Sequence, residues 1–151
     1  MLVRDHLIAS GVISGIWYYF TKSVPESLVF FLSGFIIDVD HFVDYYISHP
    51  FTLKYKKIRA ACLTMDQKEV YILLHSFELV ILAVIIGAIF FPERIYFVAV
   101  LGVVQHLMLD QVSNDTYPFS YFLIYRFLKG FRKESVFKSS RCKGFFPIKK
   151  Q

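Results

Sequence analysis

Residues 27–47 read SLVFFLSGFIIDVDHFVDYYI, an apolar run that carries Asp38, Asp40 and His41 near its middle. The run is long enough to be a membrane-spanning helix or a wholly buried one. Placing three ionisable groups in such a run costs several kcal/mol unless a partner compensates for the lost hydration. A bound cation would compensate, so this stretch points to a site as well as to a fold.

The composition of the chain favours a membrane protein. The 151 residues correspond to one domain, and 56% of them are hydrophobic, with a mean hydropathy of +0.49. Soluble proteins contain roughly 45–50% apolar residues. A soluble all-helical enzyme is the alternative interpretation. Cys62 and Cys142 match no CxxC ligand pattern, so both are expected to be reduced thiols.

Turn signals divide the chain into four apolar segments, which we expect to be membrane-spanning helices. They cover residues 6–20, 27–47, 70–91 and 95–112. The intervening residues 51–69 are expected to form a basic loop or a surface helix. Residues 118–125 are too short to span a membrane and are expected to form an interfacial or packing helix.

The predicted fold is therefore all-α, an integral membrane bundle of about four transmembrane helices with a C-terminal interfacial helix. We expect residues 1–125 to form the transmembrane domain with a metal site. Residues 126–151 are expected to form a basic cytoplasmic tail.

The basic residues lie on one side of this predicted bundle. Of the 17 Lys and Arg, all but Lys22 and Arg94 lie in the N-terminal segment, in the 48–69 loop or in the C-terminal tail. Because basic loops remain in the cytoplasm, we expect a multi-pass protein of the cell (inner) membrane with both termini cytoplasmic. The basic segments are expected to contact anionic membrane lipids. A nucleic-acid partner would depend on the tail alone and is not expected.

The ionisable residues of the predicted spans lie at one depth, within roughly two helical turns of the cytoplasmic face. The candidate metal ligands are His6, Asp38, Asp40, His41, His75, Glu78, His106 and Asp110. Imidazole and carboxylate donors favour zinc, with iron, manganese or nickel as alternatives, over calcium or magnesium. Eight donors exceed the needs of one tetrahedral ion, so either two ions or one ion with hydrogen-bonded partners is expected.

Helical spacing pairs several of these candidates. His106 and Asp110 are four residues apart, and His75 and Glu78 are three apart, so each pair is expected to share a helix face. A single buried histidine is more often a hydrogen-bonded core residue than a ligand. Several such sets at one depth favour a metal centre.

The D-x-D-H stretch contains a conflict. Asp38 and His41 share a face of an ideal helix, whereas Asp40 points roughly the opposite way. Either the helix is distorted there, or one of the two aspartates is not a ligand. Asp44 is expected to orient His41 from the second coordination sphere.

Four short motifs occur together in a fixed order: His6 followed by Gly11, the D-x-D-H at 38–41, the His-Ser at 75–76, and the H-x-x-x-D at 106–110 leading to YPFS at 117–120. This pattern resembles the membrane-bound metal-dependent hydrolases, the YdjM-like inner-membrane proteins and their bacterial and archaeal relatives. The resemblance covers residues 6 to about 120 and implies a helical membrane protein with a metal site and hydrolase activity. The chain departs from the family pattern at Ile37, where a proline is usual, and at Val70-Tyr71, where a His-Arg is common.

The predicted function is hydrolysis of an ester or phosphoester, such as a lipid or another amphiphile, by a metal-activated water at the cytoplasmic membrane face. Asp40 or Glu78 is expected to act as the general base. The alternative is a non-catalytic metal-binding membrane protein in transport, sensing or metal handling. The third and fourth spans carry no charged residue in their outer halves, which argues against an ion path.

Overall fold

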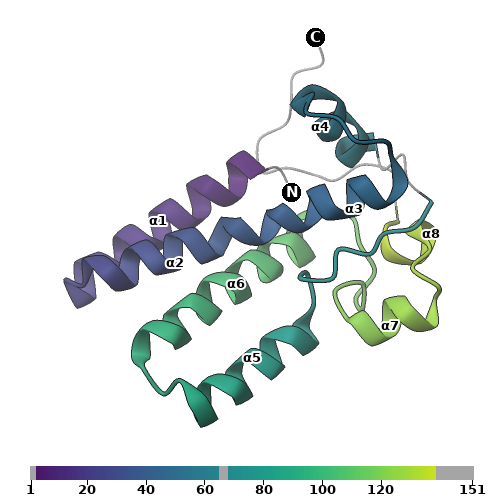
Figure 1. Cartoon of the computed structure of the whole chain (residues 1–151). Helices are drawn as coiled ribbons and strands as arrows, with labels where there is room; N and C mark the ends of the chain where they lie inside the picture. Colours follow the sequence, from purple (N-terminus) through teal and green to yellow (C-terminus); the bar gives the residue numbers. More distant parts are fainter. Residues whose placement is uncertain (1–2, 65–67, 139–151) are drawn as a thin grey trace.

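The computed structural model describes residues 3–64 and 68–138. Within this part of the chain the fold is all-α, without a β-strand and with two isolated β-bridges. Two antiparallel hairpins form its body: α1 (Val3–Thr21) pairs with α2 (Val24–Ile36), and α5 (Phe77–Phe90) pairs with α6 (Arg94–Ser113). Helix α2 packs against both α1 and α6, so the two hairpins form one bundle (Figure 1). The predicted all-α class is confirmed.

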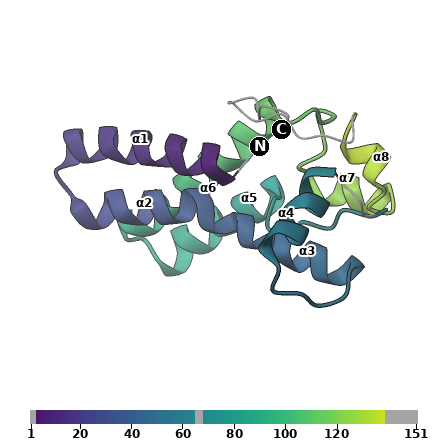
Figure 2. The same cartoon turned by 90° about the horizontal axis from the view of Figure 1, so that it is seen from above.

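The turns of the two hairpins lie at the same end of the bundle. Ser23 caps α2 by accepting the backbone N–H of Glu26 (3.4 Å), and Pro25 occupies the first turn. The Glu26 carboxylate accepts the indole N–H of Trp17 (2.9 Å) and pairs with Arg94 (3.3 Å) at the start of α6. The short helices α3, α4, α7 and α8 gather at the opposite end, as Figure 2 shows.

The apolar run from residue 27 to residue 47 is distorted at its charged centre. Helix α2 ends at Ile36, a 3-10 turn covers Ile37–Val39, and α3 covers Asp40–Ser48. A 3-10 turn advances about 120° per residue, against about 100° in an α-helix. The change in winding lets Asp38 and Asp40 both lie buried, so the first of the two alternatives for this stretch, a distorted helix, is confirmed.

The third apolar segment is only partly helical. Helix α5 begins at Phe77, after the N-cap residue Ser76, and residues 70–76 before it form an irregular loop. The prediction that His75 and Glu78 share a helix face is therefore wrong, because His75 precedes the helix. Side chains outside this loop form hydrogen bonds with its backbone. These bonds hold residues 70–76 in a non-helical conformation, although their apolar sequence predicts a helix.

The C-terminal part of the described chain packs into the protein. Helix α7 covers Leu123–Leu128, later than the predicted 118–125, and α8 covers Lys133–Val136. Arg126, Val136 and Phe137 are buried, and the last two belong to the core cluster with Val70, Ile72 and Leu107. Residues 126–138 are thus continuous with the helical domain rather than a separate tail. The rest of the predicted tail, 139–151, lies outside the described residues.

Helix α4 (Tyr55–Thr64) agrees with the surface helix expected within residues 51–69. Helix α6 matches the predicted span 95–112 and is the only helix in the described residues that is long and apolar enough to cross a membrane. Helix α5 is a shorter apolar helix of 14 residues.

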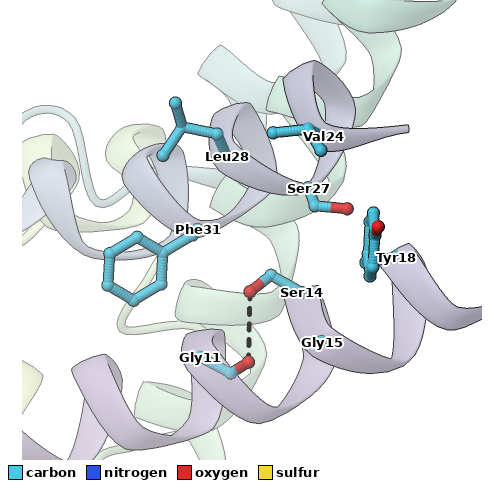
Figure 3. A pocket seen from close by; sticks show the side chains of 8 residues that line it. All are labelled: Gly11, Ser14, Gly15, Tyr18, Val24, Ser27, Leu28 and Phe31. Atoms are coloured by element: carbon cyan, nitrogen blue, oxygen red, sulfur yellow. Dashed lines mark hydrogen bonds between the residues drawn. The ribbon is translucent and has the colours of Figure 1, made fainter. Parts of the chain in front are cut away.

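An open, mostly apolar groove lies between α1 and α2 near their turn, at the end of the bundle away from the His and Asp cluster (Figure 3). Helix α1 contributes Gly11, Ser14, Gly15 and Tyr18, and a Cβ atom added at Gly15 would meet nothing within 4 Å. Gly102 on α6 differs, because its Cβ atom would meet the Ser33 hydroxyl and, at 2.6 Å, the Phe30 carbonyl oxygen of α2.

These two glycines give a matched pair of substitutions. Gly102→Ala is expected to lower the free energy of unfolding by about 1–3 kcal/mol, because α6 must move away from α2. Gly15→Ala is expected to be neutral or to stabilise by up to about 1 kcal/mol through helix propensity. Unfolding followed by circular dichroism in detergent compares them, and equal effects would contradict the close α2–α6 contact.

Candidate metal centre

Six of the eight predicted ligands converge at the end of the bundle opposite the hairpin turns. They come from α1, the 3-10 turn, α3, the loop before α5, and α6: His6, Asp38, His41, His75, His106 and Asp110. Five of the six are buried, and the side chain of His41 is 31% exposed. These residues form two groups, each of two histidines and one aspartate, that can hold a metal ion.

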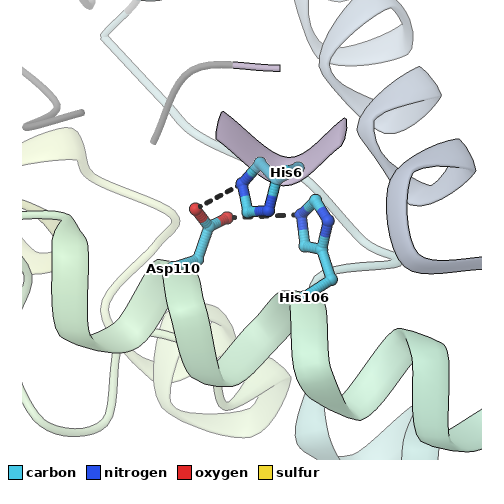
Figure 4. Close-up of side chains that lie close together, drawn as sticks. All are labelled: His6, His106 and Asp110. Carbon is cyan, nitrogen blue, oxygen red and sulfur yellow. Dashed lines mark hydrogen bonds and ion pairs between the residues drawn. The ribbon is translucent and has the colours of Figure 1, made fainter. Parts of the chain in front are cut away.

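The first group consists of His6, His106 and Asp110 (Figure 4). The Nε2 of His6 lies 3.0 Å from Asp110 Oδ1, and the Nε2 of His106 lies 3.5 Å from Asp110 Oδ2. The His6 and His106 rings stack with their centroids 3.7 Å apart. His106 Nδ1 donates to the carbonyl oxygen of Gly34 (2.9 Å), which leaves Nε2 as the atom that can bind a metal.

The second group consists of Asp38, His41 and His75. The Oδ1 of Asp38 lies 3.6 Å from the Nε2 of His41 and 3.8 Å from the Nε2 of His75. The His41 and His75 rings are tilted, with their centroids 4.8 Å apart. The residues that the sequence placed at one depth thus lie together in the structure. Two of them, His6 and Asp110, are 104 positions apart in the chain.

The two groups touch each other. His75 Nε2 lies 3.2 Å from His106 Nε2 and 3.7 Å from Asp110 Oδ2. His106 Nε2 lies 3.5 Å from Asp38 Oδ1. Zinc bonds of 2.0–2.2 Å in a tetrahedron require ligand atoms about 3.3–3.6 Å apart. Five of the six separations among these four atoms are 3.2–3.8 Å, so these atoms lie close enough together to bind a metal ion.

Asp40 lies behind His75. Its Oδ2 accepts the backbone N–H of Leu74 (2.7 Å) and lies 3.4 Å from His75 Nδ1. In this position Asp40 fixes the ring so that Nε2 faces the other ligand atoms. Asp44 accepts the backbone N–H of Tyr71 (2.7 Å) and so holds the same loop.

Glu78 is not brought to the cluster. Its two carboxylate oxygens accept the backbone N–H groups of Leu123 (2.8 Å) and Ile124 (3.0 Å), and Oε2 also accepts the Ser76 hydroxyl (2.7 Å). Glu78 therefore caps the start of α7. The i,i+3 spacing predicted that Glu78 would lie beside His75 on one helix. Helix α5 begins after His75, so the two residues do not share a helix face.

Two residues of the site carried no clear sequence signal. Arg126 is fully buried and donates to the carbonyl oxygens of Tyr71 (2.6 Å), Ile72 (2.9 Å) and His75 (2.9 Å). Burial lowers the pKa of Arg126 from its ordinary value. Its place in a basic stretch made it look like a surface charge.

Asn114 is the second such residue. Its amide donates to Asp110 Oδ1 (3.0 Å) and to the Tyr121 hydroxyl (2.8 Å). Asn114 lies four residues after Asp110, and this helical spacing is the signal that could have identified it.

The cluster contains polar atoms that the described residues leave unsatisfied. Asp38 Oδ2 and His6 Nδ1 are buried without a hydrogen-bond partner, each at a cost of about 1–3 kcal/mol.

Comparison of the chain with protein-family models, with curated proteins and with solved structures gave no match. The resemblance to the YdjM-like hydrolases therefore rests on the four motifs and stays a hypothesis. The geometry of the cluster is independent of it.

Asp40→Ala is expected to weaken metal binding by about 10–100-fold, because His75 loses the carboxylate that orients its ring. A competition titration against a chromophoric chelator measures this change. Glu78→Gln is the matched control and is expected to leave the affinity unchanged, since its carboxylate caps α7. Wild-type affinity in Asp40→Ala, or a loss in Glu78→Gln alone, would contradict these roles.

Proposed function

We propose that this protein is a membrane-embedded metal-dependent hydrolase that cleaves an ester or phosphoester bond at the cytoplasmic face. The observation that carries the proposal is the convergence of imidazole and carboxylate atoms at separations of 3.2–3.5 Å, short enough for a metal cation to bind them. This donor chemistry favours zinc, with iron, manganese and nickel as alternatives. When bound, such an ion supplies a water whose pKa is lowered to about 7.

The chain's own residues have separate roles in this proposal. The ligand atoms come from the two groups of the cluster, His6, His106 and Asp110 in one and Asp38, His41 and His75 in the other. Asp40 is a positioning residue that holds His75, in place of the general base suggested by the sequence. The half-exposed His41 marks the side from which a substrate reaches the otherwise buried cluster.

Exposed apolar side chains support the membrane location. Helix α5 exposes Ile81 (57%), Ile85 (51%) and Ile89 (64%), and α1 exposes Val12 (59%) and Ile16 (53%). Soluble monomers rarely leave apolar patches of this extent in water. In this proposal these faces contact lipid.

Four spans are part of the same proposal. Helix α6 has 20 residues and is about 30 Å long, whereas the 14 residues of α5 reach only about 21 Å. The loop before α5 continues toward the cytoplasmic side, where Val70, Ile72 and His75 are buried in protein. Non-helical backbone is tolerated at membrane depth when protein surrounds it.

The substrate class follows from the charge around the site. The exposed Lys54, Lys56 and Lys57 lie at the start of α4, at the same end of the bundle as the cluster (Figure 2). Lipid headgroups and other phosphoesters are anionic, so these lysines favour their approach. We therefore propose an anionic amphiphile as the substrate.

The test is turnover by the full-length protein, purified in detergent with its metal content measured, on a panel of phospholipids and phosphoesters. We expect turnover of at least one substrate, and its loss in His106→Ala. His49→Ala is the matched control, because His49 stacks on Tyr45 outside the cluster. Bound metal without turnover across the panel would overturn the hydrolase and favour the non-catalytic metal-binding alternative.

A further inference from the structure

We infer that the cluster binds two metal ions, one held by His6, His106 and Asp110 and the other by Asp38, His41 and His75. This inference deepens the proposed function and rests on it. It assigns each histidine of the cluster to one ion, and it identifies the ion that the substrate reaches.

One central ion does not account for the cluster. A tetrahedral ion bound by His75, His106, Asp38 and Asp110 would have all four positions filled by protein. Closed four-ligand sites are structural, whereas hydrolytic sites keep a position for water. Such an ion would also leave His6, which is 1% exposed, as a hydrogen-bonded partner of Asp110 (3.0 Å) rather than as a ligand.

Two ions give each of the six side chains a role. The two groups share no member, and the ligand atoms within each group lie within 4.8 Å of one another. Each group offers two imidazoles and one carboxylate, a set that leaves a coordination position open. Atoms of different groups lie 3.2–3.7 Å apart, so two ions held by these groups would be close neighbours, as in two-metal hydrolytic sites.

The buried atoms that lack a hydrogen-bond partner support the same division of the ligands between two ions. His6 Nδ1 belongs to one group and Asp38 Oδ2 to the other, and both are buried without a partner in the described residues. Asp38 Oδ1 already lies within 3.5–3.8 Å of three histidines. The second oxygen of Asp38, without a hydrogen-bond partner in the described residues, is available to the ion of its own group.

The two positions differ in exposure. His6, His106 and Asp110 are all buried, at 2% exposure or less. The other group includes His41, whose side chain is 31% exposed. The ion at Asp38, His41 and His75 is therefore the one that meets the substrate, and the buried ion acts on it through charge.

The test loads the metal-free full-length protein in detergent with Mn²⁺ and with Zn²⁺. Elemental analysis is expected to give two ions per chain. Electron paramagnetic resonance of the Mn²⁺ form is expected to show the multiline signal of a coupled pair. His6→Ala and His41→Ala are each expected to retain one ion and to lose the coupled signal, while His49→Ala keeps both.

The outcomes separate this inference from the proposed function. One ion per wild-type chain, with turnover retained, would overturn the two-ion inference and leave the hydrolase intact. No ion in the folded wild-type protein would overturn both. Two ions in wild type and still two in His41→Ala would overturn the assignment of His41. The wild-type stoichiometry and signal decide the question even where a variant fails to fold.

Discussion

His75→Ala is expected to lower the metal content of the purified protein and to remove the ion held by Asp38, His41 and His75. His75 Nε2 lies 3.2 Å from His106 and within 3.8 Å of both Asp38 and Asp110, so one truncation breaks contacts with both halves of the cluster. Loss of an outer-shell partner costs about 10–100-fold in affinity. Loss of this central ligand is expected to cost more, and elemental analysis after dialysis measures it.

The matched control is His49→Ala, which removes the same side chain from the end of α3. His49 Nδ1 lies 3.3 Å from the Tyr45 carbonyl oxygen, and its ring stacks on Tyr45. Metal content is expected to stay at the wild-type level. A folded His75→Ala protein with wild-type metal content would show that the cluster is a hydrogen-bonded core.

Arg126→Met is expected to have the largest effect on stability, lowering the free energy of unfolding by about 3–5 kcal/mol. The substitution leaves the carbonyl oxygens of Tyr71, Ile72 and His75 without the guanidinium that all three accept from. The Ile72 carbonyl keeps the backbone N–H of His75 (3.0 Å), and each of the other two, left unsatisfied, costs about 1–3 kcal/mol. Because the loop also carries His75, metal affinity should fall together with stability.

Lys129→Met is the control for Arg126→Met, since Lys129 lies one turn along in the same segment and is exposed. Chemical denaturation followed by circular dichroism is the measurement, with a change below about 0.5 kcal/mol expected for the control. A loss of less than 1 kcal/mol in Arg126→Met would contradict the role of Arg126 in holding the loop.

The sequence predicted the site better than it predicted the helices that carry it. The spacing of His106 and Asp110 needed only one regular helix, and α6 provides it. His6 and Asp38 were placed by depth alone, and the hairpin topology brings them to the same end of the bundle. The depth of a residue in the bundle depends on where the chain reverses direction. It can therefore be predicted even when the exact ends of the helices cannot.

The loop before α5 could not be predicted from local sequence. Its apolar residues match a helical span, but their backbone groups bind Asp40, Asp44 and Arg126, which are distant in the chain. The same contacts explain why Glu78 was misassigned and why Arg126 looked like part of a tail. The conflict between Asp38 and Asp40 was visible in the sequence: the helix is distorted there by a 3-10 turn, and of the two aspartates only Asp38 belongs to a ligand group.

X-ray absorption at the metal edge of the purified full-length protein tests the metal centre most directly. We expect a first coordination shell of nitrogen and oxygen atoms at about 2.0–2.2 Å from the metal, with the outer-shell scattering of imidazole. The same shell should be weaker in His75→Ala and unchanged in His49→Ala. A sulfur shell at about 2.3 Å, or a folded protein with no metal edge, would contradict a metal centre built from these histidines and aspartates.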